Sequence, residues 1–322
     1  MLRGLPSPLR EALRRNEPLS RHTTLRIGGP ADQFLRVRSE EELSAAVLWA
    51  CSQQLPYLVL GAGSNVLVAD AGFRGLAIAN HALGWTMLAE EDEPRATLRV
   101  ASCVPLSRLA RHTIGTGLGG LEWAIGIPGT VGGAVVGNAG AHGQCMADRL
   151  VALRVLRGEI GARRVLANEV EFGYRDSMFR CQGLHDTASA TILSAELALY
   201  RADRHELEET AGRYLALRRR TQPRGHSAGS VFRNPEGDAA GRLVDAAGLK
   251  GTTQGGAQIS RYHANFIINR GGATAADVLA LMATMRRTVW DHFGVEMQSE
   301  IVIVGEMGPE IKLLARQTVS RS

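Results

Sequence analysis

Hydrophobic residues recur at helical spacing, three or four positions apart, in three segments of the chain. These segments are residues 39–50, 204–220 and 274–289. Ser39 and Glu42 form a capping-box pattern at the start of the first segment. Thr274 and Asp277 do the same for the third segment, which Gly294 follows as a stop signal. Each segment is therefore predicted to be a helix with one apolar face.

Short β-rich or alternating runs dominate the chain from about residue 57 to residue 200. The predicted strands are residues 57–61, 66–69, 75–79, 98–102, 151–156, 191–200, 265–269 and 300–305. One clear short helix, near residues 105–116, interrupts the first six. Because strands and helices do not alternate regularly, the pattern predicts an α+β fold rather than a doubly wound sheet. The helix at 204–220 begins a section that differs in pattern from the strand-rich part before it, so we expect a domain boundary near residue 200.

A glycine-containing segment joins two of the predicted strands. It consists of Gly61, Ala62, Gly63, Ser64 and Asn65. Its glycines leave bare backbone amides that can approach a phosphate closely, and its last two side chains add donors. A Rossmann fingerprint would need a third glycine at position 66 and a helix beyond it, whereas the chain has Val66 and a strand. The segment is either a phosphate-binding loop or a tight hairpin.

The stretch from Gly115 to Gly143 is rich in glycine without resembling a flexible linker. Eleven of its 29 residues are glycine, but apolar residues such as Trp123 and Val135 are interleaved. This pattern predicts an ordered loop whose backbone wraps a large ligand. A Walker A loop is excluded because no lysine precedes Lys250. Two such segments within β structure suggest a dinucleotide held outside a Rossmann fold, for which FAD is the natural candidate.

Length and composition indicate a globular protein of two or three domains. The chain has 322 residues, of which 45% are hydrophobic and 21% charged, and this balance excludes disordered, collagenous and coiled-coil classes. No apolar run approaches the ~20 residues of a membrane helix. The N-terminal sequence lacks the apolar core of ~7–15 residues that a secretory signal needs. We therefore expect a cytoplasmic protein with no membrane partner.

The excess of basic residues favours small anionic ligands. The net charge is +5, and all 37 basic residues except Lys250 and Lys312 are arginines, which suit planar binding of phosphate and carboxylate. The arginines are spread along the chain and aromatic residues make up 5%, so no base-stacking platform is evident. No nucleic-acid partner is expected, although a basic nucleotide- or RNA-binding protein stays an alternative on charge alone.

Two familiar catalytic signatures lack support. The cysteines stand far apart without a C-x-x-C pair, and the nine histidines include no H-x-x-x-H or H-E-x-x-H spacing, so no metal site is expected. The cysteines are Cys51, Cys103, Cys145 and Cys181. Residues 225–229 match G-x-S-x-G, but the strand before and the helix after that a nucleophile elbow needs are missing from the flanking sequence. A serine hydrolase is therefore disfavoured.

Seven motifs occur in an order that resembles one known family. They are HTTLRIGGPA (22–31), LGAGSNVLV (60–68), GIPGTVGGAVVGNAGAHG (126–143), FGYRDSMF (172–179), SAGSVFRNP (227–235), HANFIIN (263–269) and GVEMQSEIVIVGE (294–306). Together they look like the UDP-N-acetylenolpyruvoylglucosamine reductase (MurB) family, over about residues 20–306. One motif alone would be weak, whereas seven in order are specific.

The resemblance implies a bipartite FAD-binding domain of the vanillyl-alcohol-oxidase (PCMH) type and a C-terminal α+β domain that binds substrate. The expected parts are an N-terminal helical segment at 1–20, the FAD-binding domain at 21–200 with subdomains at about 21–80 and 81–200, the substrate-binding domain at 201–306 and a tail at 307–322. No clear insertion separates the FGYRDS and GSVFRNP motifs, which is similar to the shorter subgroup that lacks a tyrosine-bearing lid loop.

The resemblance also implies an activity in peptidoglycan precursor synthesis, and so in cell wall biogenesis, cell shape and cell division. NADPH reduces non-covalent FAD and leaves, and flavin N5 then gives the hydride to the vinyl carbon of UDP-N-acetylglucosamine enolpyruvate. An acid protonates the neighbouring carbon to yield UDP-N-acetylmuramate. The protein is expected to be a monomer. Another FAD-dependent oxidoreductase of the same fold, acting on a sugar or an alcohol, is the alternative.

Three residues match the catalytic positions of the family. Arg175 in FGYRDS matches the arginine that polarises the substrate carboxylate, and Ser230 in GSVFRNP matches the general acid. Glu300 matches the carboxylate at the reacting end, whereas Glu296 is expected to be a solvated strand-edge charge. Hydride arrival at one carbon puts negative charge on the other, so the reaction needs a positive group to face that charge and a hydroxyl to protonate it.

Further residues match cofactor and substrate positions. The resemblance assigns cofactor binding to Gly61, Ala62, Gly63, Ser64, Asn65, Gly126, Ile127, Pro128, Gly129, Thr130, Gly132, Gly133, Asn138, Ala139 and Gly140. It assigns substrate contacts to Tyr174, Gln222, Asn234 and His263. The basic run at 218–220 and Arg224 are candidates for clamping the diphosphate, or a solvated helix end.

Overall fold

The computed structural model describes residues 4–90, 95–180 and 190–305, which fall into two compact units. Unit 1 consists of Met1–Arg15, Gln33–Ala62 and Gly75–Arg218. Unit 2 consists of Asn16–Asp32, Gly63–Arg74 and Arg219–Ser322. The domain limits expected from the sequence stay predictions, and the tail at 307–322 lies outside the described residues.

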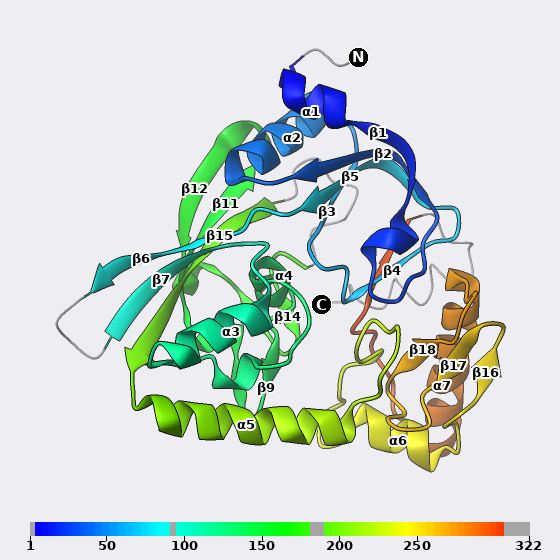
Figure 1. The fold of residues 1–322 in the computed structure, drawn as a ribbon. Coiled ribbons are helices and arrows are strands. Elements are labelled where there is room, and N and C mark those ends of the chain that lie inside the picture. The colour runs from blue at the N-terminus through cyan, green and yellow to red at the C-terminus, as the bar shows by residue number, and fades with distance from the viewer. Residues whose placement is uncertain (1–3, 91–94, 181–189, 306–322) are drawn as a thin grey trace. The chain divides into compact units, whose positions relative to one another are not determined.

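A four-stranded sheet, mostly in unit 1, ends where the first glycine-containing segment begins. Its strands are β1 (Arg14–Pro18), β2 (Pro30–Val37), β5 (Phe73–Asn80) and β3 (Tyr57–Leu60), in the order β1-β2-β5-β3 (Figure 1). The helices that pack on it are α1 (Ser7–Ala12) and α2 (Glu40–Ser52). Val47 of α2 is fully buried with Leu35 and Ile78 of the sheet. Gly61 directly follows β3.

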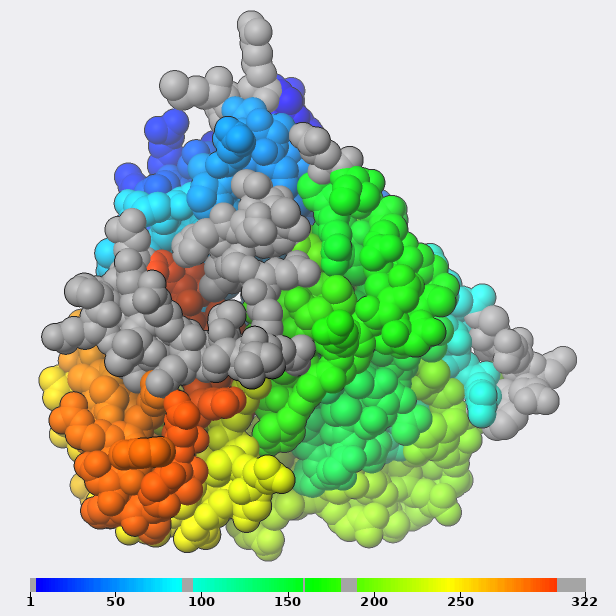
Figure 2. Space-filling view, turned by 180° about the vertical axis from the view of Figure 1, so that it is seen from behind, coloured from blue at the N-terminus to red at the C-terminus, as the bar shows by residue number. Residues whose placement is uncertain are grey.

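A larger antiparallel sheet forms the rest of the framework of unit 1. Its strands are β6 (Trp85–Glu90), β7 (Arg95–Ala101), β8 (Leu118–Gly119), β11 (Leu150–Arg157), β12 (Gly161–Leu166) and β15 (Ala190–Arg201). The order is β12-β11-β15-β7-β6, and β8 pairs with β15. Residues of β11 and β12 make up much of the green surface in Figure 2. One face of this sheet packs on the segment that joins β7 to β11, and Trp123 of that segment is fully buried.

That joining segment and its neighbours contain short elements. They are α3 (Leu106–Gly115), η2 (Glu122–Ala124), α4 (Val131–Val136), β9 (Gly140–Ala141), β10 (Gln144–Cys145), η3 (Met146–Asp148), η4 (Gly158–Ile160), η5 (Ala167–Glu169), β13 (Phe172–Gly173) and β14 (Asp176–Ser177). The long helix α5 (Arg204–Thr221) follows β15. Leu207 and Ala211 of α5 are buried against Ile114 and Ile125, which ties this helix to unit 1.

Unit 2 is built from short strands and two helices around its own core. The elements are η1 (Leu19–His22), β4 (Val66–Val68), α6 (Ala240–Ala246), β16 (Thr253–Gln254), β17 (Ala257–Ile259), β18 (Ile267–Asn269), α7 (Ala275–Phe293) and β19 (Val302–Val304). β4 and β19 run parallel, and β16, β17 and β18 form an antiparallel sheet. Phe232, Met282 and Met285 are fully buried in this core. The methionines of α7 therefore have a packing role.

Helix ends explain why the predicted helices form. The Ser39 hydroxyl accepts the N–H of Glu42 at 3.2 Å at the start of α2. Thr274 and Asp277 make the complete capping box of α7, which ends at Gly294 with a left-handed φ of 64°. Such caps satisfy backbone groups that a helix end leaves without partners. The predicted helices α2, α3, α5 and α7 are confirmed.

The strand predictions hold in position but not always in length. β18 and β19 are shorter than the apolar runs at 265–269 and 300–305. At the start of the first run the Asn265 side chain bonds to the backbone of Phe232, in place of a regular ladder. The hairpin alternative for residues 61–65 is wrong, because β3 pairs with β5 and β4 pairs with β19. The glycine-rich loop contains a short helix, α4, which the sequence pattern missed.

The described ranges contain free thiols but neither a helix that could span a membrane nor a cluster of metal ligands. No helix there is long and apolar enough to cross a membrane, and no group of three or more His, Cys, Asp or Glu side chains could hold a metal ion. Cys51, Cys103 and Cys145 are free thiols, and Cys181 lies outside the described residues. Burial raises the pKa of the Cys103 thiol to about 11, so it is protonated and unreactive at neutral pH.

Candidate active site

The two glycine-containing segments meet in unit 1. A Cβ added to Gly61 would lie 2.5 Å from Oγ1 of Thr130, so the end of β3 lies against the start of α4. Thr130 forms a bridge with Pro105, and its hydroxyl accepts the N–H of Gly133 at 3.4 Å. Both Gly61 and Ala62 are exposed beside it. The fold thus presents two stretches of bare backbone on one surface of the unit.

The glycines assigned to the cofactor differ in what surrounds them. A Cβ on Gly132 would lie 2.8 Å from Cβ of Ser102, and one on Gly140 would lie 2.5 Å from the Gln144 carbonyl oxygen. A Cβ on Gly63 would clash with the His22 carbonyl, and its φ is +59°. These three positions need glycine because the chain packs on itself there.

Gly133 is different because its missing side chain would point into open space. A Cβ there would meet nothing closer than the Thr130 hydroxyl at 3.5 Å, and the residue is exposed. Its neighbourhood therefore leaves room for a ligand to touch the backbone, which fits a flat, phosphate-bearing cofactor such as FAD. No described residue of unit 1 fills that space.

Helix α3 holds the start of the same glycine-rich loop in place. The N–H of Gly126 donates to the Ser107 hydroxyl at 2.8 Å, and the N–H of Leu106 donates to the Gly129 carbonyl at 3.0 Å. Gly126 has a φ of +73°, a conformation that favours glycine. Pro128 is exposed between these two anchors, and Ile127 is half-buried. The loop is therefore ordered, as the apolar residues within it indicated.

Gly133→Ala is expected to lower FAD occupancy without harming the fold. Alanine favours a helix over glycine by up to ~1 kcal/mol, so the protein without cofactor should be as stable or more stable. A methyl group in the open space should reduce the flavin retained on purification to less than half. The matched control is Gly212→Ala, at an exposed position of α5 where an added Cβ would have no neighbour within 4 Å. Flavin absorbance and thermal melts check both variants, and full occupancy in Gly133→Ala would remove α4 from the cofactor site.

Arg175 lies at the tip of a tight hairpin in unit 1. β13 and β14 pair through Phe172 with Ser177 and Gly173 with Asp176, which leaves Tyr174 and Arg175 as the two-residue loop. Arg175 has a φ of +54° and Tyr174 has no positive φ, which is the pattern of a type II turn with Arg175 as its second central residue. Its guanidinium lies 5.7 Å from the ring centre of Tyr174, whose side chain is 58% exposed. The turn thus presents an arginine and an aromatic ring together.

Asn138 connects this hairpin to the glycine-rich loop. Its Nδ2 donates to the Gly173 carbonyl at 3.0 Å, and its Oδ1 accepts the N–H of Ala147 at 3.2 Å. The Ser177 hydroxyl adds a bond to the Val136 carbonyl at 2.8 Å. Asn138 is buried and its amide is engaged at both ends, so in this structure it positions the Arg175 hairpin. Ala139 lies next to it, and its carbonyl accepts the N–H of Met146.

A second arginine of unit 1 lies within electrostatic reach of Arg175. Burial and the charge of Arg175 lower the pKa of Arg218, which is near the end of α5. Burial and the charge of Arg218 likewise lower the pKa of His142, whose ring stacks on Tyr214 at 3.8 Å. Two like charges close together are relieved when an anion binds between them. The sequence ranked Arg218 no higher than its neighbours, because the contact with Arg175 depends on the fold.

Unit 2 brings the segments that carry Ser230, Glu300 and Asn65 next to one another. The N–H of Glu300 donates to the carbonyl of Val231, the residue after Ser230, at 2.8 Å. The Asn65 side chain donates to the Glu300 carbonyl at 3.1 Å, and the Val302 N–H donates to the Asn65 carbonyl at 2.9 Å. Backbone bonds and the Asn65 side chain therefore hold three segments that are distant in sequence beside one another. Ser64 directly precedes Asn65 and is half-buried.

Asn265 is a positioning residue that the sequence analysis did not single out. It is 2% exposed, and its side chain accepts the Phe232 N–H at 3.0 Å and donates to the Phe232 carbonyl at 2.8 Å. Its own carbonyl accepts the N–H of Val231 at 2.8 Å. These bonds fix the segment that carries Ser230. A polar residue between the apolar residues of HANFIIN was the available signal.

The remaining substrate candidates lie in unit 2 with partners of their own. Asn234 accepts the N–H of Ala240 at 3.0 Å at the start of α6. His263 accepts the N–H of Asn265 on Nδ1 at 3.2 Å, and burial followed by the charge of Lys250 lowers its pKa. Its ring is thus neutral at physiological pH. Gln222 is half-buried just after α5, and Arg224 is exposed.

Two local expectations agree with the geometry. Residues 222–229 contain neither a strand before Ser227 nor a helix after it, so no nucleophile elbow forms there. Glu296 is exposed and lies 3.7 Å from the Arg286 guanidinium, as a solvated surface charge does.

Family comparisons define the class of protein. A model described as an FAD binding domain matches residues 31–161, and a model of the C-terminal domain of UDP-N-acetylenolpyruvoylglucosamine reductase matches residues 222–304. The chain is therefore an FAD-containing oxidoreductase with a separate C-terminal domain, and the predicted fold class is confirmed. It belongs to the UDP-N-acetylenolpyruvoylglucosamine reductase (MurB) family, as the relatives below establish.

Curated relatives match nearly the whole chain. The UDP-N-acetylenolpyruvoylglucosamine reductase of Chloroflexus aggregans is 42% identical over 91% of this chain and 97% of its own. Reductase 2 of Symbiobacterium thermophilum is 45% identical over 91% of this chain and 92% of its own. The solved structure of the reductase from Thermus caldophilus is 34% identical, with a TM-score of 0.74, and covers 91% of this chain and 100% of that one. The sequence resemblance is thus confirmed.

Proposed function

We propose that this protein uses NADPH to reduce UDP-N-acetylglucosamine enolpyruvate to UDP-N-acetylmuramate, a step of peptidoglycan precursor synthesis. The observation that carries the proposal is one chain with an FAD-binding domain and the C-terminal domain of this reductase family. The relatives named above carry the same activity in their names. We also place the reaction in the cytoplasm, and the monomeric state stays a prediction.

FAD would be held by exposed backbone at the start of α4 and the end of β3. Gly61, Ala62, Gly126 and Gly133 are exposed there, so a cofactor could approach the backbone closely at these positions. The N–H groups of Gly126 and Gly133 already donate to the hydroxyls of Ser107 and Thr130, so the amides of Gly61 and Ala62 would be the ones to face a pyrophosphate. When bound, FAD carries the hydride from NADPH to the substrate. The blocked positions, such as Gly132, would shape the loop and would not touch the cofactor.

The chain's own side chains would handle the charge and the proton. Arg175, presented on its hairpin, would face the substrate carboxylate and stabilise the negative charge that appears when hydride reaches the vinyl carbon. Ser230 would then donate its hydroxyl proton to the neighbouring carbon. Glu300, held next to the Ser230 segment by the Val231 carbonyl, would orient the groups around that proton transfer.

Further polar groups are proposed to bind the substrate. Tyr174 is exposed beside Arg175 and is proposed to contact the sugar nucleotide, as are Gln222, Asn234 and His263. Asn234 would do so through its amide nitrogen, because its oxygen caps α6.

Arg218→Gln is expected to raise KM for the enolpyruvyl substrate at least about tenfold and to change kcat less, because a lost hydrogen bond to a charged group weakens binding by about that much. Arg218 and Arg175 repel each other, so an anionic part of the substrate would bind favourably between them. The matched control is Arg219→Gln, an exposed neighbour on α5 whose loss should leave KM unchanged. Steady-state kinetics distinguish the two, and equal KM values for both variants would contradict the assignment.

An anaerobic titration of the purified protein tests the proposed function. The visible spectrum should show near-stoichiometric flavin, NADPH should bleach it rapidly, and the enolpyruvyl substrate should restore it. A flavin that NADPH leaves oxidised, but that a sugar or an alcohol reduces, would indicate another oxidoreductase of this fold. A colourless protein that binds mixed RNA with a steep loss of affinity in salt would indicate the basic binding protein instead.

A further inference from the structure

Glu122 is a buried carboxylate in the glycine-rich loop of unit 1, and the site described above gives it no role. The residue is 4% exposed. Its Oε2 accepts the N–H of Gly120 at 2.8 Å, and its Oε1 accepts the hydroxyl of Tyr200 at 3.2 Å. A carboxylate is costly to bury unless hydrogen bonds replace the water that it loses. Both oxygens of Glu122 have such bonds, which fix the carboxylate between the loop and β15.

Tyr200, near the end of β15, covers the start of the loop. It pairs with Gly119 of β8, and a Cβ on Gly119 would lie 2.5 Å from the tyrosine ring. The guanidinium of Arg149 lies 5.7 Å from the centre of the same ring. Burial and the charge of Glu122 raise the pKa of Tyr200, so its hydroxyl is protonated at neutral pH and can donate. Position 119 therefore needs glycine, because the ring that bonds to Glu122 lies where a side chain would be.

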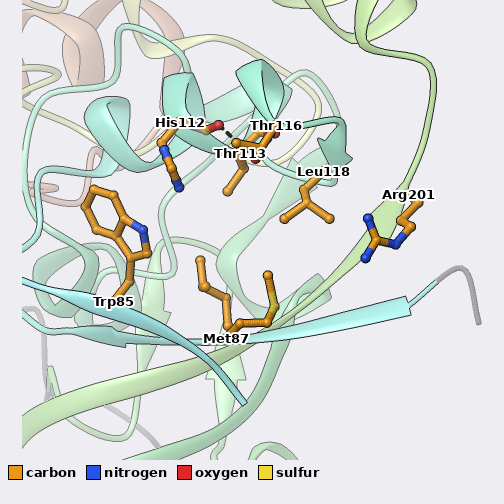
Figure 3. A pocket seen from close by; sticks show the side chains of 8 residues that line it. Trp85, Met87, His112, Thr113, Thr116, Leu118 and Arg201 are labelled. Atoms are coloured by element: carbon orange, nitrogen blue, oxygen red, sulfur yellow. Dashed lines mark hydrogen bonds between the residues drawn. The ribbon is translucent and has the colours of Figure 1, made fainter. Parts of the chain in front are cut away.

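The opposite side of this strand pair faces another part of unit 1. Arg201 and Leu118 are paired residues of β15 and β8, and both line a cavity between β6, β7 and α3 (Figure 3). Successive side chains of a strand point to opposite sides, so Tyr200 points away from that cavity. The cluster of Glu122, Tyr200 and Arg149 is thus separate from the cavity and belongs to the loop.

Hydrogen bonds continue from Glu122 along the chain to the exposed part of the loop. The carbonyl of Glu122 accepts the N–H of Ile125 at 3.3 Å, and the carbonyl of Ala124 accepts the N–H of Ile127 at 3.1 Å. Gly126 lies between these two donors and is exposed. The position of Glu122 therefore affects the backbone at Gly126, where the cofactor is proposed to approach.

We propose that Glu122 is a positioning residue for the cofactor. Its carboxylate holds residues 119–127 in the conformation that binds FAD, and the Tyr200 hydroxyl holds the carboxylate. The inference rests on the placement of FAD at this loop under the proposed function. A residue that only stabilised the fold would change the melting temperature and leave the affinity of the folded protein for FAD unchanged.

The test measures the dissociation constant of FAD in three variants. The FAD-loaded protein is diluted well below its melting temperature, and the fluorescence of released flavin gives the fraction dissociated. Glu122→Ala should raise the dissociation constant at least about tenfold, because two donors lose their bonds to a charged group. Tyr200→Phe keeps the ring and loses one of these bonds, so it should raise the constant about threefold or more. Glu122→Gln should stay within about twofold, because an amide can accept from Gly120 and donate to the Tyr200 oxygen.

Val47→Ala is the matched control for a loss of stability. Val47 is fully buried in the core between α2 and the four-stranded sheet, so the smaller side chain should lower the melting temperature. It should leave the dissociation constant of FAD unchanged. If Val47→Ala weakens FAD binding as much as Glu122→Ala does, the role of Glu122 is only structural and the proposal fails.

Three other outcomes would also overturn the proposal. They are an unchanged dissociation constant in Glu122→Ala, an unchanged constant in Tyr200→Phe, and a constant in Glu122→Gln as high as in Glu122→Ala. Tyr200→Phe decides the question even if Glu122→Ala fails to fold. Gly133→Ala separates this inference from the placement of FAD. Weaker binding there, with unchanged binding in Glu122→Ala, would refute the role of Glu122 alone, whereas unchanged binding in both would also remove the proposed cofactor site.

Discussion

Ser230→Ala should still be bleached by NADPH at a near-normal rate, while reoxidation by the enolpyruvyl substrate slows at least about a hundredfold. Hydride delivery to the cofactor needs no proton from this hydroxyl. The second half-reaction does need it, because the carbon next to the one that receives hydride must be protonated. The backbone around Ser230 is held by Asn265 and Phe266 and by the Val231–Glu300 bond, so alanine should leave the strand in place. Anaerobic stopped-flow spectroscopy measures the two half-reactions separately.

Two further serine variants control this experiment. Ser230→Cys should recover part of the rate, since a thiol can also donate a proton. Ser227→Ala should behave as the unmodified protein, because the bond that Ser227 makes is through its backbone carbonyl, which accepts the Thr24 hydroxyl at 2.7 Å and is kept in alanine. If both half-reactions slow equally in Ser230→Ala, or if Ser227→Ala is the variant that blocks reoxidation, Ser230 is not the acid.

Glu300→Gln should also slow the substrate half-reaction by about a hundredfold or more, with the NADPH half-reaction little changed. Glutamine keeps the size and the backbone bonds of the residue, including those to Val231 and Asn65, and removes only the negative charge. The loss would therefore report the role of the carboxylate beside the proton donor. The same stopped-flow measurement applies, supported by a melting curve that should stay close to that of the unmodified protein.

Glu296→Gln is the matched control for this substitution. Glu296 lies four residues earlier, is exposed and faces Arg286 at 3.7 Å, and a surface pair of this kind contributes little, about 0–1 kcal/mol. It should change neither half-reaction. Equal slowing in the two variants would mean that charge near the strand, and not the Glu300 carboxylate, affects the reaction.

The regular elements that the sequence predicted correctly have local signals. The capping box of Thr274 and Asp277 and the stop at Gly294 mark α7 to within one residue. Alternating and β-rich runs located β3, β7, β11 and β15. Elements without such signals were missed: α4 lies among glycines, and α6 begins without a capping side chain of its own.

The family, and with it the cofactor FAD, was also predicted from the sequence, because the motifs contain residues that the reaction needs and occur in the order typical of the family. Individual roles within the motifs did not follow in the same way. Gly132 and Gly133 are adjacent letters of one motif, yet one packs on Ser102 and the other faces open space. The atoms that a side chain at a glycine position would contact depend on how the folded chain packs around that position.

The sequence by itself determined the local elements, the order of the motifs and the family, since capping, periodicity and turn chemistry act over a few residues. Only the tertiary structure decided that Gly61 lies against Thr130 and that Arg175 lies close enough to Arg218 to lower the pKa of Arg218. It also decided that the segments carrying Asn65, Ser230 and Glu300 are hydrogen-bonded neighbours. The physical reason is that these relations join segments 43 to 235 positions apart. Backbone pairing and burial bring such segments together, and neither is encoded in any one segment.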